Sequence, residues 1–196
     1  LTGYDDATQT FTAQDTYRGP DKKIPYNQLE SEWKPFNYLY MIVYLPEQEE
    51  EIKTILGSNW DADLNRQRTL ELAQAATAAD PSDAFAWFNV GSNLVYFERY
   101  DEANAAYDKS RERMFRYQFG AFLANFHANR NDDLLALTEY ALQRTEMSEE
   151  TWLWRGWALY RNGDLNGAIK AWRKALSIRP AYEDALYALN FVGSTP

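Results

Sequence analysis

The sequence predicts an α+β protein that is mostly α, in which a small, incomplete β-rich head precedes an antiparallel helical solenoid. Residues 1–46 contain short runs of strand-forming residues separated by polar turns. From Glu47 onward the apolar residues recur at helical spacing, and three stretches repeat one another at intervals of 33 and then 32 residues. Repeats of this length indicate stacked helix pairs, because no single pair can bury its apolar face alone.

Three columns of residues define this repeat. In the first column, 33 residues separate Gly91 from Ala124 and 32 separate Ala124 from Gly156. The other two columns have the same spacings and consist of Ala103, Ala136 and Ala168, and of Tyr107, Tyr140 and Trp172. We expect the small residues to let paired helices approach and the aromatic residues to fill the space against the next repeat.

The head is expected to alternate short strands and turns around one helix. The expected elements are strands at 1–4 and 9–14 joined by a turn at Asp5 and Asp6, a loop at 17–22, a strand at 24–26, a helix at 27–33 capped by Asn27, and a buried strand at 36–45. Behind the head, the acidic run that begins at Glu47 predicts the first turn of a short helix ending at Gly57, because carboxylates favour helix N-termini. A longer helix is expected at 61–79.

Composition excludes several classes of function. The formal net charge is −9, which disfavours nucleic acid as a partner because phosphate binding needs clustered Lys and Arg. Cysteine is absent, so no disulfide or thiolate metal site can form, and the sequence predicts no metal and no cofactor. No apolar run reaches the roughly 18 residues of a membrane helix.

The repeats resemble the tetratricopeptide repeat (TPR). That family has a Trp-x-x-Leu-Gly-x-x-Tyr stretch in its first helix and Ala, aromatic, Ala and Pro positions in and after its second. The first repeat matches through Trp87, Val90, Gly91, Leu94, Ala103, Tyr107 and Ser110. The third matches through Trp152, Gly156, Leu159, Gly163, Ala168, Trp172, Ala175 and Pro180. The middle repeat is degenerate and keeps only Leu123, Ala124, Ala136 and Tyr140.

The resemblance implies that the first helix of each pair lines a concave groove that binds a protein or peptide. The implied groove residues are Phe88, Ser92, Tyr96, Asn125, Asn129, Trp157, Tyr160 and Arg161. Aromatic, Asn and Arg side chains suit peptide recognition. The alternative is that Phe88, Trp157 and Tyr160 pack against the head and bind no partner. His127, the only histidine, is expected to be packed or hydrogen-bonded on its helix rather than catalytic or metal-binding.

The head resembles the C-terminal half of a papain-like, bacteriocin-processing (double-glycine) cysteine peptidase domain. The resemblance rests on Gly3-Tyr-Asp-Asp6, the strand ending at Asp15, Gly19, and Tyr26-x-x-Leu29-x-x-x-Trp33. It implies that Asp15 orients a catalytic histidine, although Thr16 stands where that family usually has Pro. The nucleophilic cysteine and the histidine would both precede Leu1, and this chain has neither there. The alternative role for Asp15 is to cap the turn at residues 16–19.

These patterns divide the chain into a peptidase-like head (1–46), linking helices with a half-repeat (47–83), three TPR-like repeats (84–182) and a terminal capping helix and tail (183–196). We expect an interaction scaffold without catalytic activity as the chain stands. The alternative is the C-terminal fragment of a cysteine peptidase, active only with its upstream half. Unpaired strand edges in residues 1–46 predict self-association. The first residue, Leu1, predicts a fragment of a longer bacterial protein, and the sequence leaves cytoplasmic and cell-surface locations open.

Overall fold

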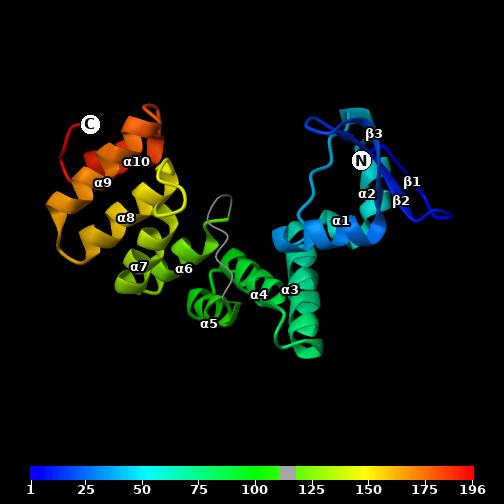
Figure 1. Ribbon diagram of the computed structural model, residues 1–196, viewed down its shortest axis with the longest axis horizontal. Coiled ribbons are helices and arrows are strands. Elements are labelled where there is room, and N and C mark those ends of the chain that lie inside the picture. The colour runs from blue at the N-terminus through cyan, green and yellow to red at the C-terminus, as the bar shows by residue number, and fades with distance from the viewer. Residues whose placement is uncertain (111–117) are drawn as a thin grey trace. The chain divides into compact units, whose positions relative to one another are not determined.

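A computed structural model describes residues 1–110 and 118–196 of the chain (Figure 1). The described residues form two compact units, Leu1–Asn89 and Val90–Pro196. A small antiparallel sheet precedes a series of helices, which confirms the predicted α+β, mostly α class. The expected junction between the first and second repeats includes residues 111–117, which lie outside the described residues. None of the helices in the described part of the chain is long and apolar enough to cross a membrane.

The sheet of the first unit has the order β1-β2-β3, with β1 at Gly3–Asp5, β2 at Thr10–Asp15 and β3 at Gly19–Pro25. Phe11 in β2 lies opposite Tyr4 in β1 and Ile24 in β3, and its ring packs 4.4 Å from the ring of Tyr26. The prediction of a loop at 17–22 is wrong from Gly19 onward, because β3 begins there and pairs Lys22 with Ala13 of β2.

The helix after the sheet begins earlier than expected. Helix α1 spans Tyr26–Trp33 with Pro25 at its N-cap, so Asn27 is not the cap. The ladder of β3 runs to Pro25, and proline ends it because the ring removes the N–H that a strand needs. A 3-10 turn, η1 (Lys34–Phe36), follows.

The buried strand expected at 36–45 is wrong. These residues join neither the sheet nor any helix beyond Phe36, and the side chains of Met41 and Val43 are each 89% exposed. Asn37 and Tyr38 adopt left-handed backbone angles, with φ of 54° and 53°, which breaks an extended run at its start. High β-propensity does not make a strand where no neighbouring strand supplies a ladder.

The remaining elements of the first unit are η2 (Pro46–Gln48), α2 (Glu49–Leu56), η3 (Gly57–Trp60) and α3 (Ala62–Ala79). The acidic residues of α2 occupy its first turn as expected. Asp61 caps α3 by accepting hydrogen bonds from the backbone N–H groups of Asp63 and Leu64, both at 2.9 Å. Helix α4 (Ala84–Tyr96) begins in this unit, where the Lys34 ammonium bonds Asp83 and the Asn89 amide donates to the Lys34 carbonyl at 2.9 Å.

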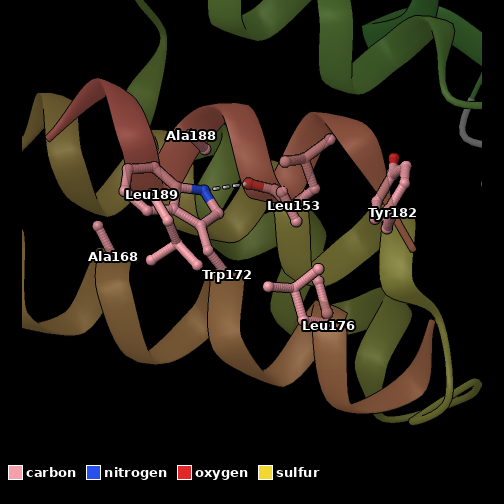
Figure 2. Close-up of a cluster of buried hydrophobic side chains, with 9 residues drawn as sticks. Leu153, Ala168, Trp172, Leu176, Tyr182, Ala188 and Leu189 are labelled. Carbon is pink, nitrogen blue, oxygen red and sulfur yellow. Dashed lines mark hydrogen bonds between the residues drawn. The ribbon is translucent and has the colours of Figure 1, made fainter. Parts of the chain in front are cut away.

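In its described residues the second unit continues α4 and adds six helices as an antiparallel array: α5 (Tyr100–Ser110), α6 (Gly120–His127), α7 (Asn131–Leu142), α8 (Glu149–Arg161), α9 (Leu165–Ile178) and α10 (Glu183–Phe191). Figure 2 shows its terminal core, where α10 closes over α8 and α9. The fully buried indole of Trp172 donates a hydrogen bond to the Leu153 carbonyl at 3.2 Å and packs among aliphatic side chains that include Leu189.

The turn inside each helix pair fixes the true register of the repeats. The backbone N–H groups of Arg99, Arg130 and Asp164 donate to the carbonyls of Leu94, Asn125 and Leu159 respectively. The residue just before each donor has a positive φ, and these residues are Glu98 (57°), Asn129 (57°) and Gly163 (84°). Equivalent positions are therefore separated by 31 and then 34 residues, so the expected spacings of 33 and 32 misplace the middle repeat by two residues.

The corrected register changes which middle-repeat residues are core. Phe122, not Ala124, is equivalent to Gly91 and Gly156, and Thr138, not Tyr140, is equivalent to Tyr107 and Trp172. Leu134 replaces Ala136 in the remaining column. Phe122, Leu134 and Thr138 are all fully buried, whereas Ala136 is exposed and Tyr140 lies under the Arg144 guanidinium at 3.5 Å. The middle repeat thus carries its bulk on the first helix of the pair instead of the second.

Candidate functional site: an aromatic surface on the first helices

The second unit presents aromatic side chains along the first helices of its repeats. In the corrected register Leu123, Trp157 and Phe191 occupy one column at a constant spacing of 34, on α6, α8 and α10. Phe126 and Tyr160 form a neighbouring column with the same spacing. Equivalent positions on successive first helices lie on one face of a helical array. We name the surface formed by Phe126, Trp157, Tyr160, Tyr187 and Phe191 the aromatic stripe.

Ring contacts connect the stripe from one repeat to the next. The ring centroid of Trp157 lies 6.0 Å from that of Phe126 and 5.8 Å from that of Phe191. Tyr160 lies 5.8 Å from Phe191, and Tyr187 lies 6.3 Å from it. These separations fall in the range of favourable aromatic pairs. The rings therefore support one another while each keeps an outer face or edge.

Much of this aromatic surface faces solvent. The exposed fractions are 36% for Tyr160, 63% for Tyr187 and 54% for Phe191, whereas Trp157 is half-buried beneath them. Helix α10 was expected to cap the array, and a capping helix normally presents a polar outer face. It buries Ala185, Ala188 and Leu189 but leaves two aromatic rings outside. An exposed cluster of large apolar side chains is typical of an interaction site.

Arg161 places a positive charge at one side of the stripe. Its guanidinium lies 3.6 Å from the centroid of the Phe126 ring, a cation–π contact. Its Nη1 donates to the Phe126 carbonyl and, at 2.9 Å, to the Asn129 side-chain oxygen. Partial burial lowers the pKa of Arg161 from its ordinary value. The side chain nevertheless stays charged at neutral pH, because the ordinary pKa of arginine is so high. Within residues 1–110 and 118–196, no acceptor is paired with its Nε or Nη2.

The structure separates six of the eight predicted groove residues into two groups. Trp157, Tyr160, Arg161 and Asn129 come together at the stripe. Phe88 and Asn125 are buried and are not accessible to a ligand. Phe88 is 2% exposed, and Asn125 occupies the core position that is equivalent to Leu94 and Leu159 in the other repeats. The Asn125 amide donates to the Ala121 carbonyl at 2.8 Å.

The other two predicted groove residues lie on the first helix of the first repeat. The Ser92 hydroxyl lies 3.4 Å from the Tyr107 hydroxyl, so it is engaged with its own helix pair. Tyr96 is exposed and its ring meets that of Phe97 edge-on, with centroids 5.2 Å apart.

Sequence reasoning missed Phe126, Tyr187 and Phe191. The two-residue error in the predicted register of the middle repeat placed its groove positions at Asn125 and Asn129 instead of Leu123 and His127. For the same reason Phe126 was not recognised as equivalent to Tyr160. The left-handed Asn129, equivalent to Gly163, was the available signal, because Asn tolerates this conformation better than most residues.

His127 lies at the surface, and its ring contacts two aromatic side chains. Its ring stacks on Tyr100 with centroids 4.4 Å apart and an interplanar angle of 12°, and it meets Phe126 edge-on at 5.4 Å. Burial, followed by the charge of Glu98, raises the pKa of Tyr100. Across the described residues, no group of three or more His, Asp or Glu side chains is positioned to hold a metal ion.

Asp15, the residue expected to orient a catalytic histidine, lies at the end of β2. Its Oδ1 accepts hydrogen bonds from the backbone N–H groups of Arg18 at 2.7 Å and Tyr17 at 2.8 Å. These two bonds, the Arg18 bond first, lower the pKa of the carboxyl group. This geometry is that of an aspartate capping a turn, and it supports the alternative role.

Comparison with known sequences gives a match for part of the chain. A search of the curated proteins gives no match. The C-terminal part of the chain does match a family model, over the end of α7 and all of α8, α9 and α10. Residues 141–192 match the TPR repeat, and together with the helical architecture this match supports a scaffold for protein–protein interaction.

Proposed function

We propose that the second unit binds an extended peptide segment of a partner protein along the aromatic stripe. The observation that carries the proposal is the continuity of the rings from Phe126 through Trp157 to Phe191 across three first helices. A stripe of this kind presents apolar surface at regular intervals. An extended chain can place successive side chains against it without folding first.

The chemistry of the stripe defines the ligand. Tyr160, Tyr187 and Phe191 are rigid side chains that bury large areas at low conformational cost. They suit apolar, aromatic or proline side chains, which pack on ring faces. Arg161 favours a ligand with a hydrogen-bond acceptor, because Nη1 is engaged within the protein while Nε and Nη2 have no acceptor among the described residues. A carboxylate or a backbone carbonyl of the peptide meets that requirement.

A peptidase role depends on Asp15 alone in this chain. A carboxylate orients a base but performs no acyl transfer by itself, and the turn amides already engage Asp15. Nothing in the head therefore favours a reaction over an interaction, and binding is the function that we propose.

The test is selection of peptides from a displayed library of random extended sequences, followed by affinity measurement by fluorescence anisotropy. We expect the selected peptides to be rich in apolar or aromatic residues with an acidic residue or free carboxylate nearby. Tyr160→Ala and Phe191→Ala should each weaken binding by about tenfold or more, as truncation of an aromatic anchor does. Arg161→Gln should weaken acidic peptides more than neutral ones.

Met147→Ala is the matched control, since Met147 is an exposed apolar residue between α7 and α8 and is not a member of the stripe. Helical circular dichroism of each variant separates lost binding from lost folding. The proposal fails if selection yields no peptide, or if the stripe variants bind the selected peptides as tightly as Met147→Ala does.

A further inference from the structure

Residues 39–45 form an apolar segment that belongs to neither the sheet nor a helix of the first unit. In Figure 1 this segment is part of the light-blue coil between α1 and α2. Exposure alternates along it. The odd-numbered side chains are the more exposed, at 69% for Leu39, 89% for Met41, 89% for Val43 and 59% for Leu45, against 44% for Tyr40 and 39% for Ile42. Alternation of this kind is typical of an extended chain with one face outward.

The even-numbered side chains hold the segment against its own unit. The ring of Tyr44 lies 6.3 Å from that of Trp60, and the Tyr40 hydroxyl accepts a hydrogen bond from Asn65 of α3 at 3.4 Å. At the N-terminal end, the Trp33 indole donates to the Leu39 carbonyl at 2.7 Å. At the other end, the Leu45 N–H donates to the Gln48 side chain at 2.9 Å. The segment is thus anchored at its ends and along its inner side.

The main chain between these anchors is unpaired. Within the described residues, no backbone–backbone hydrogen bond engages residues 40–44. An apolar stretch of extended backbone with free N–H and C=O groups is a template for pairing with another strand. Beside it lies a hollow of about 670 Å³ lined by Leu1, Trp33 and residues 40–43 among others. The surface is therefore open both at its main chain and at its side chains.

The order of the residues identifies the partner strand. Residues 39–45 read Leu-Tyr-Met-Ile-Val-Tyr-Leu, which is nearly the same in both directions about Ile42. We propose that two copies of the protein associate by antiparallel pairing of this segment, with a two-fold axis at Ile42. Leu39 then lies opposite Leu45 of the second copy, Tyr40 opposite Tyr44, and Met41 opposite Val43. A two-fold interface requires such self-complementarity, and the segment carries no charge that would oppose it.

The edges of the sheet suit self-association less well. The outer strand β3 contains Pro20 and Pro25, which cannot donate to a ladder, and its Lys22 and Lys23 would meet like charges in a second copy. Strand β1 has only three residues. The self-association expected for residues 1–46 is accordingly placed at 39–45. This inference uses the first unit alone and does not depend on peptide binding at the aromatic stripe.

A single cysteine at the axis tests the register, because the natural chain has none. Directly opposed residues of antiparallel strands have Cα atoms about 4.5 or 5.5 Å apart, within the range that a disulfide spans. We expect Ile42→Cys to form a covalent dimer under mild oxidation much faster than Met147→Cys, which places the thiol on an exposed site elsewhere. Equal cross-linking of the two variants would overturn the proposal.

Charge substitutions test the pairing without a covalent bond. Analytical ultracentrifugation should show a concentration-dependent dimer for the wild type and for Met147→Lys. Met41→Lys combined with Val43→Lys places lysines opposite lysines and should yield a monomer. Met41→Lys combined with Val43→Glu places opposite charges across the axis and should restore the dimer. A monomeric wild type, or a dimer that survives the double lysine variant, would show that this segment does not pair with itself.

Discussion

Gly91 lies against the ring of Tyr107 so closely that a Cβ on the glycine would fall 2.6 to 2.8 Å from three ring carbons. Real Cβ atoms essentially never approach other atoms to this distance. Gly156 is packed just as closely against the ring of Trp172, two helix pairs further along the array. The glycine on the first helix and the aromatic ring on the second are therefore one packing unit, and this unit explains why both residue types recur at fixed separation.

Substitution of that glycine should destabilise the array. Gly156→Ala forces the fully buried indole of Trp172 to move, and overpacking of this kind costs about 1–3 kcal/mol of unfolding free energy. Urea unfolding followed by helical circular dichroism measures the loss. In a Trp172→Leu background the same substitution should cost less, because the smaller side chain leaves room. Equal costs in the two backgrounds would mean that the two residues are not coupled.

The left-handed turn residue of the first repeat offers a stabilising substitution. Glu98 has φ 57° at the position where the third repeat has Gly163. Left-handed backbone costs a residue with a Cβ more than it costs glycine, so Glu98→Gly should raise the unfolding free energy by about 0.5–1 kcal/mol. Gly163→Ala is the converse variant and should lower it by a similar amount. A less stable Glu98→Gly protein would argue that the Glu98 side chain makes a contribution beyond its backbone.

The head should lose stability in acid through Asp15. Its hydrogen bonds with the N–H groups of Arg18 and Tyr17 depress the folded-state pKa below the unfolded value. The stabilisation is present above the unfolded pKa, about 4, and disappears as the pH falls through the folded pKa. Titration of the carboxyl carbons by NMR should place Asp15 below the usual aspartate value. The Asp15→Ala protein should show a weaker acid dependence of unfolding, and an unchanged dependence would count against the turn-capping role.

At alkaline pH the second unit should lose stability through Tyr107. Burial raises the pKa of this hydroxyl to about 12, and the bond with Ser92 offsets a small part of that shift. The unfolded chain ionises near pH 10, so the stability that Tyr107 supplies is complete below that pH and is lost as the pH rises toward 12. Stability curves of wild type and Tyr107→Phe should diverge in this window. Parallel curves would show that Tyr107 ionises as readily in the folded protein as in the unfolded one.

The sequence predicted what local pattern controls. The helical array, the terminal helix and the first two strands follow from periodicity and turn residues. The strand predicted at 36–45 was wrong. Its Tyr, Ile and Val content indicates β-propensity, but a strand also needs a neighbouring strand to bond with, and the sheet of β1, β2 and β3 does not pair with this segment. The prediction of Asn27 as the helix cap was wrong because β3 ends at Pro25 and α1 begins at the next residue, so that Pro25 occupies the N-cap position.

The candidate site was half predicted, for a different reason. Matching residue types aligned Ala124 and Tyr140 with the glycine and aromatic columns, and that alignment hid Phe126. The backbone turn at Asn129 sets the register instead, and it does not depend on which residue of the pair is large. Alignment by side-chain similarity gives the wrong register when the large and the small residue of a packed pair exchange places, as Phe122 and Thr138 do in the middle repeat.

The exchanged sizes of the middle repeat restrict how the array can be recombined. Phe122 brings the bulk that Tyr107 and Trp172 bring in the other repeats, and Thr138 makes room for it. A hybrid that joins α6 to α9 would place two large side chains in one layer, and one that joins α8 to α7 would leave that layer underfilled. The helix pair of the middle repeat can therefore be transplanted only as a whole, and a chimera that includes it must be cut between repeats and not at its internal turn.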